Sequence, residues 1–201
     1  GSEMCIRDSK ESPLGFKLES QETVPSSGWK IEKVSDRKVR DEWKPLWGKR
    51  AVVEDHFNEL VIDLVNPAGQ PERMQLVVRG YNDGFAFCYK IPDGEGPRVN
   101  VQSELTAYNF AGDYTAWFYN GENHNIGPEK LTETDGTRLP VMTVKAGDKH
   151  YMAIHEACLE TGAPLVLQSK GGESLFSVAS KPTSLSPGYT SAWRVVLYGT
   201  T

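Results

Sequence analysis

Short runs in which apolar and polar residues alternate recur along the chain, and they carry the strongest information about its fold. Successive residues of a β-strand point to opposite faces, so alternation with a period of two predicts strands that bury one face. The β-branched and aromatic residues in these runs also favour strands. The clearest runs align the following residues on one face: Leu60, Ile62 and Leu64; Met74, Leu76 and Val78; Phe85, Phe87, Tyr89 and Ile91; Trp193, Val195 and Leu197.

Turn-forming residues separate these runs at short intervals, at 66–70 (NPAGQ), 82–84 (NDG), 92–97 (PDGEGP), 134–136 (TDG) and 170–172 (KGG). Asp83-Gly84 is a dipeptide that supplies the positive φ of a tight turn, so residues 67–91 are predicted to form a β-hairpin. Only RKVRDEW (37–43) and HEACLETG (155–162) could be helical, and both are short. The pattern predicts a single all-β domain, an antiparallel β-sandwich.

Composition excludes several classes of protein. The chain has 201 residues, 38% of them hydrophobic, which is enough for one domain with a sizeable core. No apolar run approaches the roughly 20 residues that a membrane helix needs. The net charge is −5 with acids and bases interspersed, so neither a nucleic-acid nor a membrane partner is expected. Three cysteines, Cys5, Cys88 and Cys158, have the spacing of neither a zinc site nor a disulfide framework.

Residues that could carry chemistry are scattered. The four histidines lie at 56, 124, 150 and 155, and a strand would place His150 and His155 on opposite faces, which does not suit a paired metal site. His124 is expected in an exposed loop. Glycoside hydrolysis needs two carboxylates facing one sugar, and sequence alone does not identify such a pair among 27 acids.

The stretch YMAIHEACLE (151–160) poses the sharpest question, because it carries a carboxylate into the end of a strand. Glu156 would share a face with Met152 and Ile154, while His155 would lie on the other face. A carboxylate at the rim of a core is costly unless it is paired, hydrogen-bonded or bound to a metal. Two interpretations stay open: pairing with a lysine or the next turn, or coordination of a hard cation such as calcium.

Aromatic residues in YTAWFYNG (114–121) are the best candidates for stacking on a sugar ring. They are Trp117 and Tyr119. Packing in the core is the alternative for both side chains, because large aromatic residues dominate the interiors of sandwiches.

Six motifs occur in an order and spacing that resemble the N-terminal domain of glycoside hydrolase family 97, from Ser12 to Thr201. They are SPLGFKL (12–18), DEWKPLWGKR (41–50), DHFNELVIDL (55–64), RGYNDGFAFCYKIP (79–92), YMAIHEACL (151–159) and SAWRVVLYG (191–199). That family contains α-glucosidases and α-galactosidases, mostly from Bacteroidetes.

The resemblance implies a galactose-mutarotase-like β-super-sandwich that precedes a catalytic (β/α)8 barrel and a small C-terminal β domain. It implies that this domain packs on the active-site face of the barrel and gives one glutamate to a calcium ion there. The matching motif is Ile154-His155-Glu156-Ala157, so Glu156 is the predicted metal ligand; His155, Trp117 and Tyr119 are candidates for substrate binding. α-Linked glucosides or galactosides are the implied substrates, and the implied location is periplasmic or secreted.

Several departures from the family pattern shape the expectations. Residues 1–11 lack the alternation of the family's opening strands and are expected to be an expression scar followed by a foreign or disordered segment, with the domain at 12–201. The barrel is absent, so no hydrolysis and only weak or undetectable calcium binding are expected of this chain alone. Cys88 stands where the family has an arginine. An edge left open by the missing strands predicts self-association or β-augmentation.

Two other functions remain as alternatives. A stand-alone carbohydrate-binding module would use an aromatic platform to bind sugar without cleaving it. A small mutarotase-like enzyme on a similar sandwich would need His155 and a glutamate to converge on the substrate.

Overall fold

The structure is a computed structural model that describes residues 12–18, 29–67, 71–94, 96–119, 121, 125–160, 163–178 and 182–200. Within these ranges helical structure is limited to one 3-10 turn, η1 (Leu131–Glu133). The strands are β1 (Phe16–Leu18), β2 (Lys30–Trp43), β3 (Val53–Val65), β4 (Arg73–Tyr81), β5 (Gly84–Lys90), β6 (Val99–Glu104), β7 (Ala107–Asn109), β8 (Thr115–Tyr119), β9 (Asn125–Lys130), β10 (Asp135–Ala146), β11 (His150–Ala157), β12 (Leu167–Lys170), β13 (Leu175–Val178), β14 (Thr183–Leu185) and β15 (Trp193–Thr200). None of the described residues forms a helix long and apolar enough to cross a membrane.

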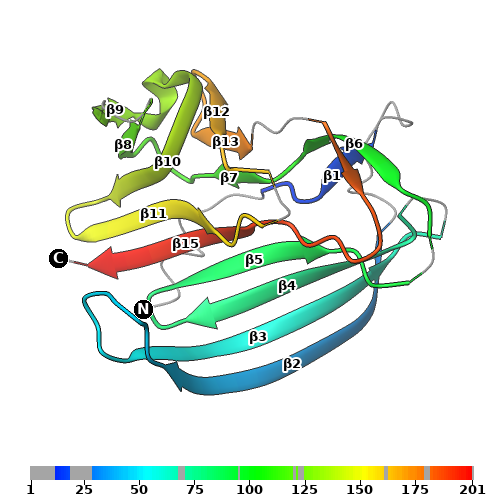
Figure 1. The fold of residues 1–201 in the computed structure, drawn as a ribbon. Helices are drawn as coiled ribbons and strands as arrows, with labels where there is room; N and C mark the ends of the chain where they lie inside the picture. Colours follow the sequence, from blue (N-terminus) through cyan, green and yellow to red (C-terminus); the bar gives the residue numbers. More distant parts are fainter. Residues whose placement is uncertain are drawn as a thin grey trace.

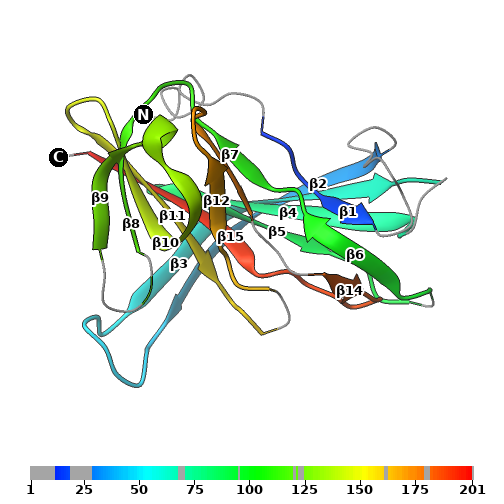
Figure 2. The ribbon, with the colours of Figure 1, turned by 90° about the horizontal axis from the view of Figure 1, so that it is seen from above.

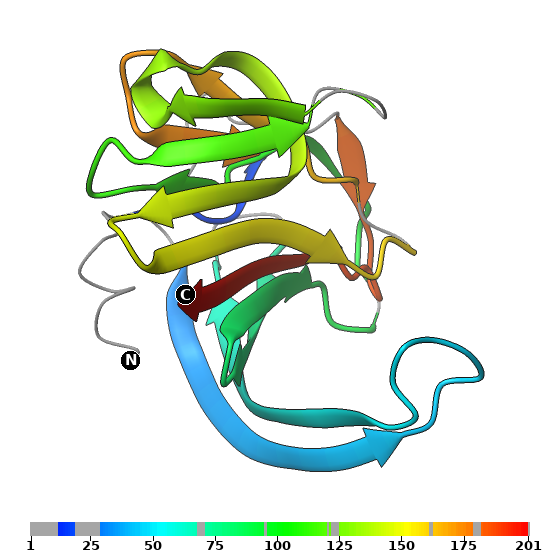
Figure 3. The ribbon, with the colours of Figure 1, turned by 90° about the vertical axis from the view of Figure 1, so that its left-hand side faces the viewer.

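The strands form two antiparallel sheets. The larger sheet has the order β2-β3-β4-β5-β15-β11-β10-β12-β13-β7, with β8 and β9 joined to it through β10. It curves strongly, so that β7, β12 and β13 come to lie above its middle strands (Figures 1 and 3). The smaller sheet, β1-β6-β14, lies beside them and covers β4 and β5 (Figure 2). The predicted antiparallel β-sandwich is therefore confirmed.

The predicted hairpin forms as expected. β4 pairs with β5 and closes with Tyr81 opposite Gly84, around a turn at Asn82 and Asp83. The positive φ expected at Gly84 is not found. Glycine is required at this position for another reason, because a Cβ atom there would collide with the carbonyl oxygen of Val196 on β15. The turn thus also fixes how closely β5 approaches β15.

Two segments that could have been helical form strands instead, and one predicted turn was wrong. Residues 37–43 belong to β2 and not to a helix, because pairing with β3 extends along the whole strand. The segment from His155 to Ala157 is the end of β11 and is likewise not helical. Asp135 and Gly136 do not form a turn, since they pair with Lys170 and Ser169 in the first part of β10.

Two clusters of buried side chains make up the core. The first lies within the curved part of the large sheet and consists of Phe110, Ala116, Phe118, Leu131, Met142, Val144, Ile154, Leu165, Leu167, Phe176 and Val178. The second joins the large sheet to the small one and consists of Met74, Phe87, Tyr89, Ile91, Val99, Val101 and Leu185. Burial of apolar surface on this scale supplies most of the stabilisation of the fold.

In strand β15 the more deeply buried face is not the one that carries Trp193, Val195 and Leu197. Leu197 is 43% exposed, whereas Arg194 and Val196 on the alternate face are 1% and 8% exposed. A charged residue therefore occupies a central core position, which places a polar cluster between the two sheets.

Strand β2, in contrast, is almost entirely exposed to solvent: all but one of its residues are exposed. Among the described strands it pairs only with β3, so its outer edge is open. Its fourteen residues include five lysines or arginines and four acids. At its end, the connection to β3 presents Trp43, Leu46 and Trp47, which are 54%, 101% and 87% exposed.

Candidate functional site

Glu156 lies at the end of β11, on the face that the alternation predicts. Ile154 is 1% exposed and Met152 packs against the first core cluster, so both point inward with Glu156. Glu156 pairs in register with Arg194 on the neighbouring strand β15. The carboxylate therefore lies at the rim of the core, beside the buried arginine.

Arg194 connects the two sheets. Its Nε lies 3.1 Å from Oε1 of Glu104 and its Nη2 lies 2.5 Å from Oε2 of the same residue, at the end of β6 in the small sheet. The side chains of Arg194 and Glu104 are 1% and 5% exposed. Burial alone would lower the pKa of Arg194, but the hydrogen bond and charge of Glu104 outweigh it and raise the pKa above its usual value.

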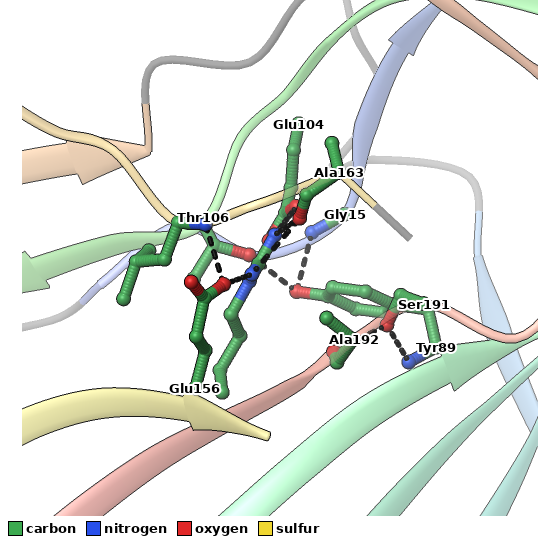
Figure 4. Close-up of polar contacts among 10 residues, drawn as sticks. Gly15, Tyr89, Glu104, Thr106, Glu156, Ala163, Ser191 and Ala192 are labelled. Carbon is green, nitrogen blue, oxygen red and sulfur yellow. Dashed lines mark hydrogen bonds and ion pairs between the residues drawn. The ribbon is translucent and has the colours of Figure 1, made fainter. Parts of the chain in front are cut away.

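Glu156 completes this cluster through one oxygen (Figure 4). Its Oε2 accepts a hydrogen bond from the backbone N–H of Leu165 at 2.5 Å and lies 3.4 Å from Nη1 of Arg194. Arg194 also donates to the carbonyl oxygen of Ala163, with its Nη1 and Nη2 each 3.5 Å away. Two carboxylates share one guanidinium, so the cluster carries one surplus negative charge.

A second set of hydrogen bonds surrounds the cluster and ties β5 to the small sheet. The hydroxyl of Tyr89 accepts a bond from the N–H of Gly15 at 3.0 Å and lies 2.9 Å from the hydroxyl of Thr106. The N–H of Tyr89 in turn donates to the hydroxyl of Ser191 at 2.9 Å. These contacts fix the strands that carry Glu104 and Arg194 (Figure 4).

Tyr108, on β7, is the unusual member of this region. Its hydroxyl is buried and has no hydrogen-bond partner among the described residues. Burial raises its pKa well above the usual value, and the nearby charge of Arg194 opposes that shift. Tyr108 lines an apolar cavity of about 600 Å³ enclosed mainly by strands of the large sheet, namely β4, β5, β7, β11 and β15. None of the four predicted site residues lines this cavity.

The other three predicted site residues lie away from Glu156. Trp117 pairs with Thr143, which pairs with Ala153 on β11, so all three share one face of the sheet. His155 shares that face because it is two residues from Ala153, and it is exposed. Tyr119, 41% exposed, follows Trp117 on the same face of β8. Glu156 is on the inner face, so the structure does not gather the four residues into one pocket.

The remaining histidines and cysteines do not add to the site. Nδ1 of His150 lies 2.5 Å from the hydroxyl of Tyr198, and His124 and Cys5 lie outside the described residues. Cys88 is completely buried, and burial raises its pKa to about 11. Cys158 is exposed. No group of three or more His, Cys, Asp or Glu residues that could hold a metal occurs among the described residues.

A separate ionic cluster braces β2, β3 and β4. Glu59 is 6% exposed and accepts hydrogen bonds from Nε of Arg37 at 2.6 Å and Nε of Arg79 at 2.8 Å. Burial would raise the pKa of Glu59, but these two arginines outweigh it and lower the pKa. The guanidinium of Arg79 also lies 4.3 Å and 4.5 Å from the ring centres of Phe57 and Trp193. Such stacking favours the cation, and the cluster is structural.

Sequence reasoning missed Glu104 and the role of Arg194. The available signal was the arginine itself, within the apolar strand AWRVVLY (192–198), because a buried charge requires a partner. That partner is 90 residues away along the chain, and nothing local to Arg194 identifies it.

Comparison with known proteins covers nearly the whole chain. Residues 9–201 match the family model described as Glycosyl-hydrolase 97 N-terminal. A probable retaining alpha-galactosidase of Streptomyces bingchenggensis (strain BCW-1) is 29% identical in an alignment of 168 positions that covers 75% of this chain and 25% of that protein.

Solved structures give the same result for the fold. A glycoside hydrolase family 97 enzyme of Pseudoalteromonas sp. strain K8, solved in complex with acarbose, matches with a TM-score of 0.81 and 24% identity over 96% of this chain and 31% of that one. The crystal structure of a beta-arabinopyranosidase matches with a TM-score of 0.80 and 18% identity over 96% of this chain and 35% of that one. The chain thus spans a quarter to about a third of these relatives, and the family match over residues 9–201 identifies it as a member of the glycoside hydrolase family 97 N-terminal domain family.

Proposed function

We propose that this chain is the non-catalytic N-terminal domain of a calcium-dependent family 97 α-glycosidase. In that enzyme it packs on a (β/α)8 catalytic barrel in the same polypeptide, shapes the pocket for α-linked glucosides or galactosides and donates Glu156 to a calcium ion. The match to the family model and the greater length of the relatives support this proposal. A periplasmic or secreted location belongs to the same proposal.

Glu156 suits the role of a calcium ligand. Both of its contacts use Oε2, and among the described residues its Oε1 accepts no hydrogen bond. The side chain keeps 10% of its surface exposed, and the cluster has a surplus negative charge that favours a cation. Calcium takes six to eight oxygen ligands, so one carboxylate oxygen is a partial shell that other ligands have to complete. Bound calcium would supply a fixed positive charge beside the sugar.

The exposed end of the β2–β3 hairpin supports the proposed packing on a barrel. Trp43, Leu46 and Trp47 form an apolar group there, and large exposed apolar groups mark interaction sites. This end of the hairpin and the end of β11, which carries Glu156, project toward the same side of the molecule (Figures 2 and 3). One docked domain could therefore cover the hairpin end and complete the shell around Glu156.

The free oxygen of Glu156 is the observation that carries the proposal, and a joined polypeptide tests it. The chain would be linked to a family 97 barrel, and hydrolysis of p-nitrophenyl α-glucoside and α-galactoside measured against calcium concentration. Glu156→Gln should raise the calcium concentration needed for half-maximal activity by about tenfold or more, because it removes a charged ligand. Glu160→Gln, an exposed acid four residues away, is the matched control.

Two outcomes contradict the proposal. One is an unchanged calcium requirement in Glu156→Gln, which would remove the metal role. The other is measurable hydrolysis by the 201-residue chain alone, because the proposal places all catalytic residues in the barrel.

A further inference from the structure

Arg194 divides its hydrogen bonds unequally between two carboxylates. Nε and Nη2 contact both oxygens of Glu104, at 3.1 and 2.5 Å. Only Nη1 reaches Glu156, at 3.4 Å, and it is shared with the carbonyl oxygen of Ala163 at 3.5 Å. Bidentate arginine–carboxylate pairs, in which two N–H groups contact the two carboxylate oxygens, are stronger than contacts through a single N–H group. The guanidinium is therefore held mainly by Glu104.

We infer that Glu104 is a positioning residue that keeps Glu156 available to a cation. A carboxylate in a two-pronged pair with arginine has both oxygens occupied and its charge neutralised, which makes it a poor metal ligand. By taking that pair for itself, Glu104 leaves Glu156 with one bonded and one unbonded oxygen. This inference rests on the proposed function and adds to it the residue that prepares the ligand.

The geometry of Glu156 agrees with this role. The N–H of Leu165 and Nη1 of Arg194 both contact Oε2, so the carboxylate is held from one side. Glu104 comes from β6 in the small sheet and Glu156 from β11 in the large one. The small sheet thus sets the electrostatic state of a side chain at the rim of the large sheet.

Replacement of Glu104 by glutamine makes the consequence measurable. Glu104→Gln keeps an oxygen that can accept a bond from Arg194 but removes the negative charge, so the cluster becomes neutral overall. Arg194 then pairs mainly with Glu156. Loss of one negative charge from the cluster that includes Glu156 should weaken cation binding by about tenfold. Glu104→Asp restores the charge with a shorter side chain and should recover most of the affinity.

The test uses the 201-residue chain itself and gadolinium, an oxygen-seeking paramagnetic ion, as the probe. Paramagnetic broadening is sensitive to partial occupancy, so weak binding by an incomplete ligand shell is measurable. The readout is broadening of the Leu165 amide signal, since its N–H contacts Glu156 at 2.5 Å. The series is wild type, Glu156→Gln, Glu104→Gln and Glu104→Asp, with the exposed Glu173→Gln as the control for net charge.

The outcomes separate the inference from the function on which it rests. Broadening that is unchanged in Glu156→Gln would overturn the proposed metal ligand. Loss of broadening in Glu156→Gln, with Glu104→Gln behaving like Glu173→Gln, would overturn only the positioning role. If the Glu104 variants do not fold, the wild-type chain still tests the inference. Calcium addition should shift the Nη1 signal of Arg194 more than its Nε signal, because only Nη1 contacts Glu156. An equal or larger shift of the Nε signal would contradict the inference.

Discussion

Arg194 and Glu104 join the two sheets through a buried pair whose closest atoms, Nη2 and Oε2, are 2.5 Å apart. The side chains are 1% and 5% exposed, so both charges are withdrawn from water. Removing a partner from such a pair leaves the other charge buried and uncompensated. Arg194→Met should therefore lower the free energy of unfolding by about 3–5 kcal/mol, measured by urea denaturation.

A surface pair provides the matched control for Arg194. Arg73 contacts Glu32 with both side chains about half exposed, at 55% and 44%. Arg73→Met should leave the unfolding free energy nearly unchanged, because exposed ion pairs contribute little. The double variant Arg194→Met/Glu104→Leu should recover stability, because neither charge remains buried. Equal losses in the Arg194 and Arg73 variants would contradict the assignment of a buried pair.

Gly84→Ala should destabilise the domain at the β4–β5 turn. The added methyl group would collide with the backbone carbonyl of Val196, which cannot move without displacing β15. We expect a loss of about 2 kcal/mol in unfolding free energy. Gly199→Ala on the same strand as Val196 is the control, because nothing lies within 4 Å of its added carbon atom. Equal effects in the two variants would argue against the close approach of β5 and β15.

The described cysteines should differ sharply in reactivity. Burial raises the pKa of Cys88 to about 11, and the thiolate is the reactive form, so Cys88 should resist alkylation in the folded protein. Exposed Cys158 should react readily. In a Cys5→Ser background, mass spectrometry should find one adduct before denaturation and two after it. Labelling of Cys88 under native conditions would show that β5 opens locally.

Glu59 should make stability depend on acid pH. Its pKa is lower in the folded protein than in the unfolded chain, because Arg37 and Arg79 outweigh the effect of burial. Its contribution is complete above the unfolded pKa of about 4.5 and is lost as the pH falls through the folded pKa. The difference in unfolding free energy between wild type and Glu59→Gln should therefore shrink from about pH 7 to about pH 3. A constant difference would contradict the lowered pKa.

Calorimetry with maltooligosaccharides and galactosides distinguishes an accessory domain from a stand-alone carbohydrate-binding module. His155, Trp117 and Tyr119 share the outer face, but Glu156 is on the inner face, so no single pocket joins them. We expect no binding in the micromolar range. Micromolar affinity that Trp117→Ala abolishes would favour the binding module instead. His155→Ala should leave anomer interconversion unchanged, because the accessory domain is expected to have no mutarotase activity.

Local patterns predicted most of the fold, and long-range contacts explain what they missed. The 67–91 hairpin and the inward face of Glu156 follow from alternation and turn residues alone. The sequence did not predict strand β2, because charged residues on both of its faces obscure the period of two. Pairing with β3 is what makes this segment a strand. The role of Glu104 was not predicted, because Arg194 becomes buried and meets its partner only when two distant strands come together across the sandwich.

The charges along β2 affect how strongly its open edge can pair with a strand of another molecule. The outer edge of this fourteen-residue strand leaves backbone groups unpaired, and such an edge would ordinarily act as a template for fibril growth. Here nine ionised side chains hold a shell of water along that edge, and an incoming strand would have to strip it away. Self-association through an edge remains a prediction for sedimentation to test, and the charges on β2 oppose it at that edge.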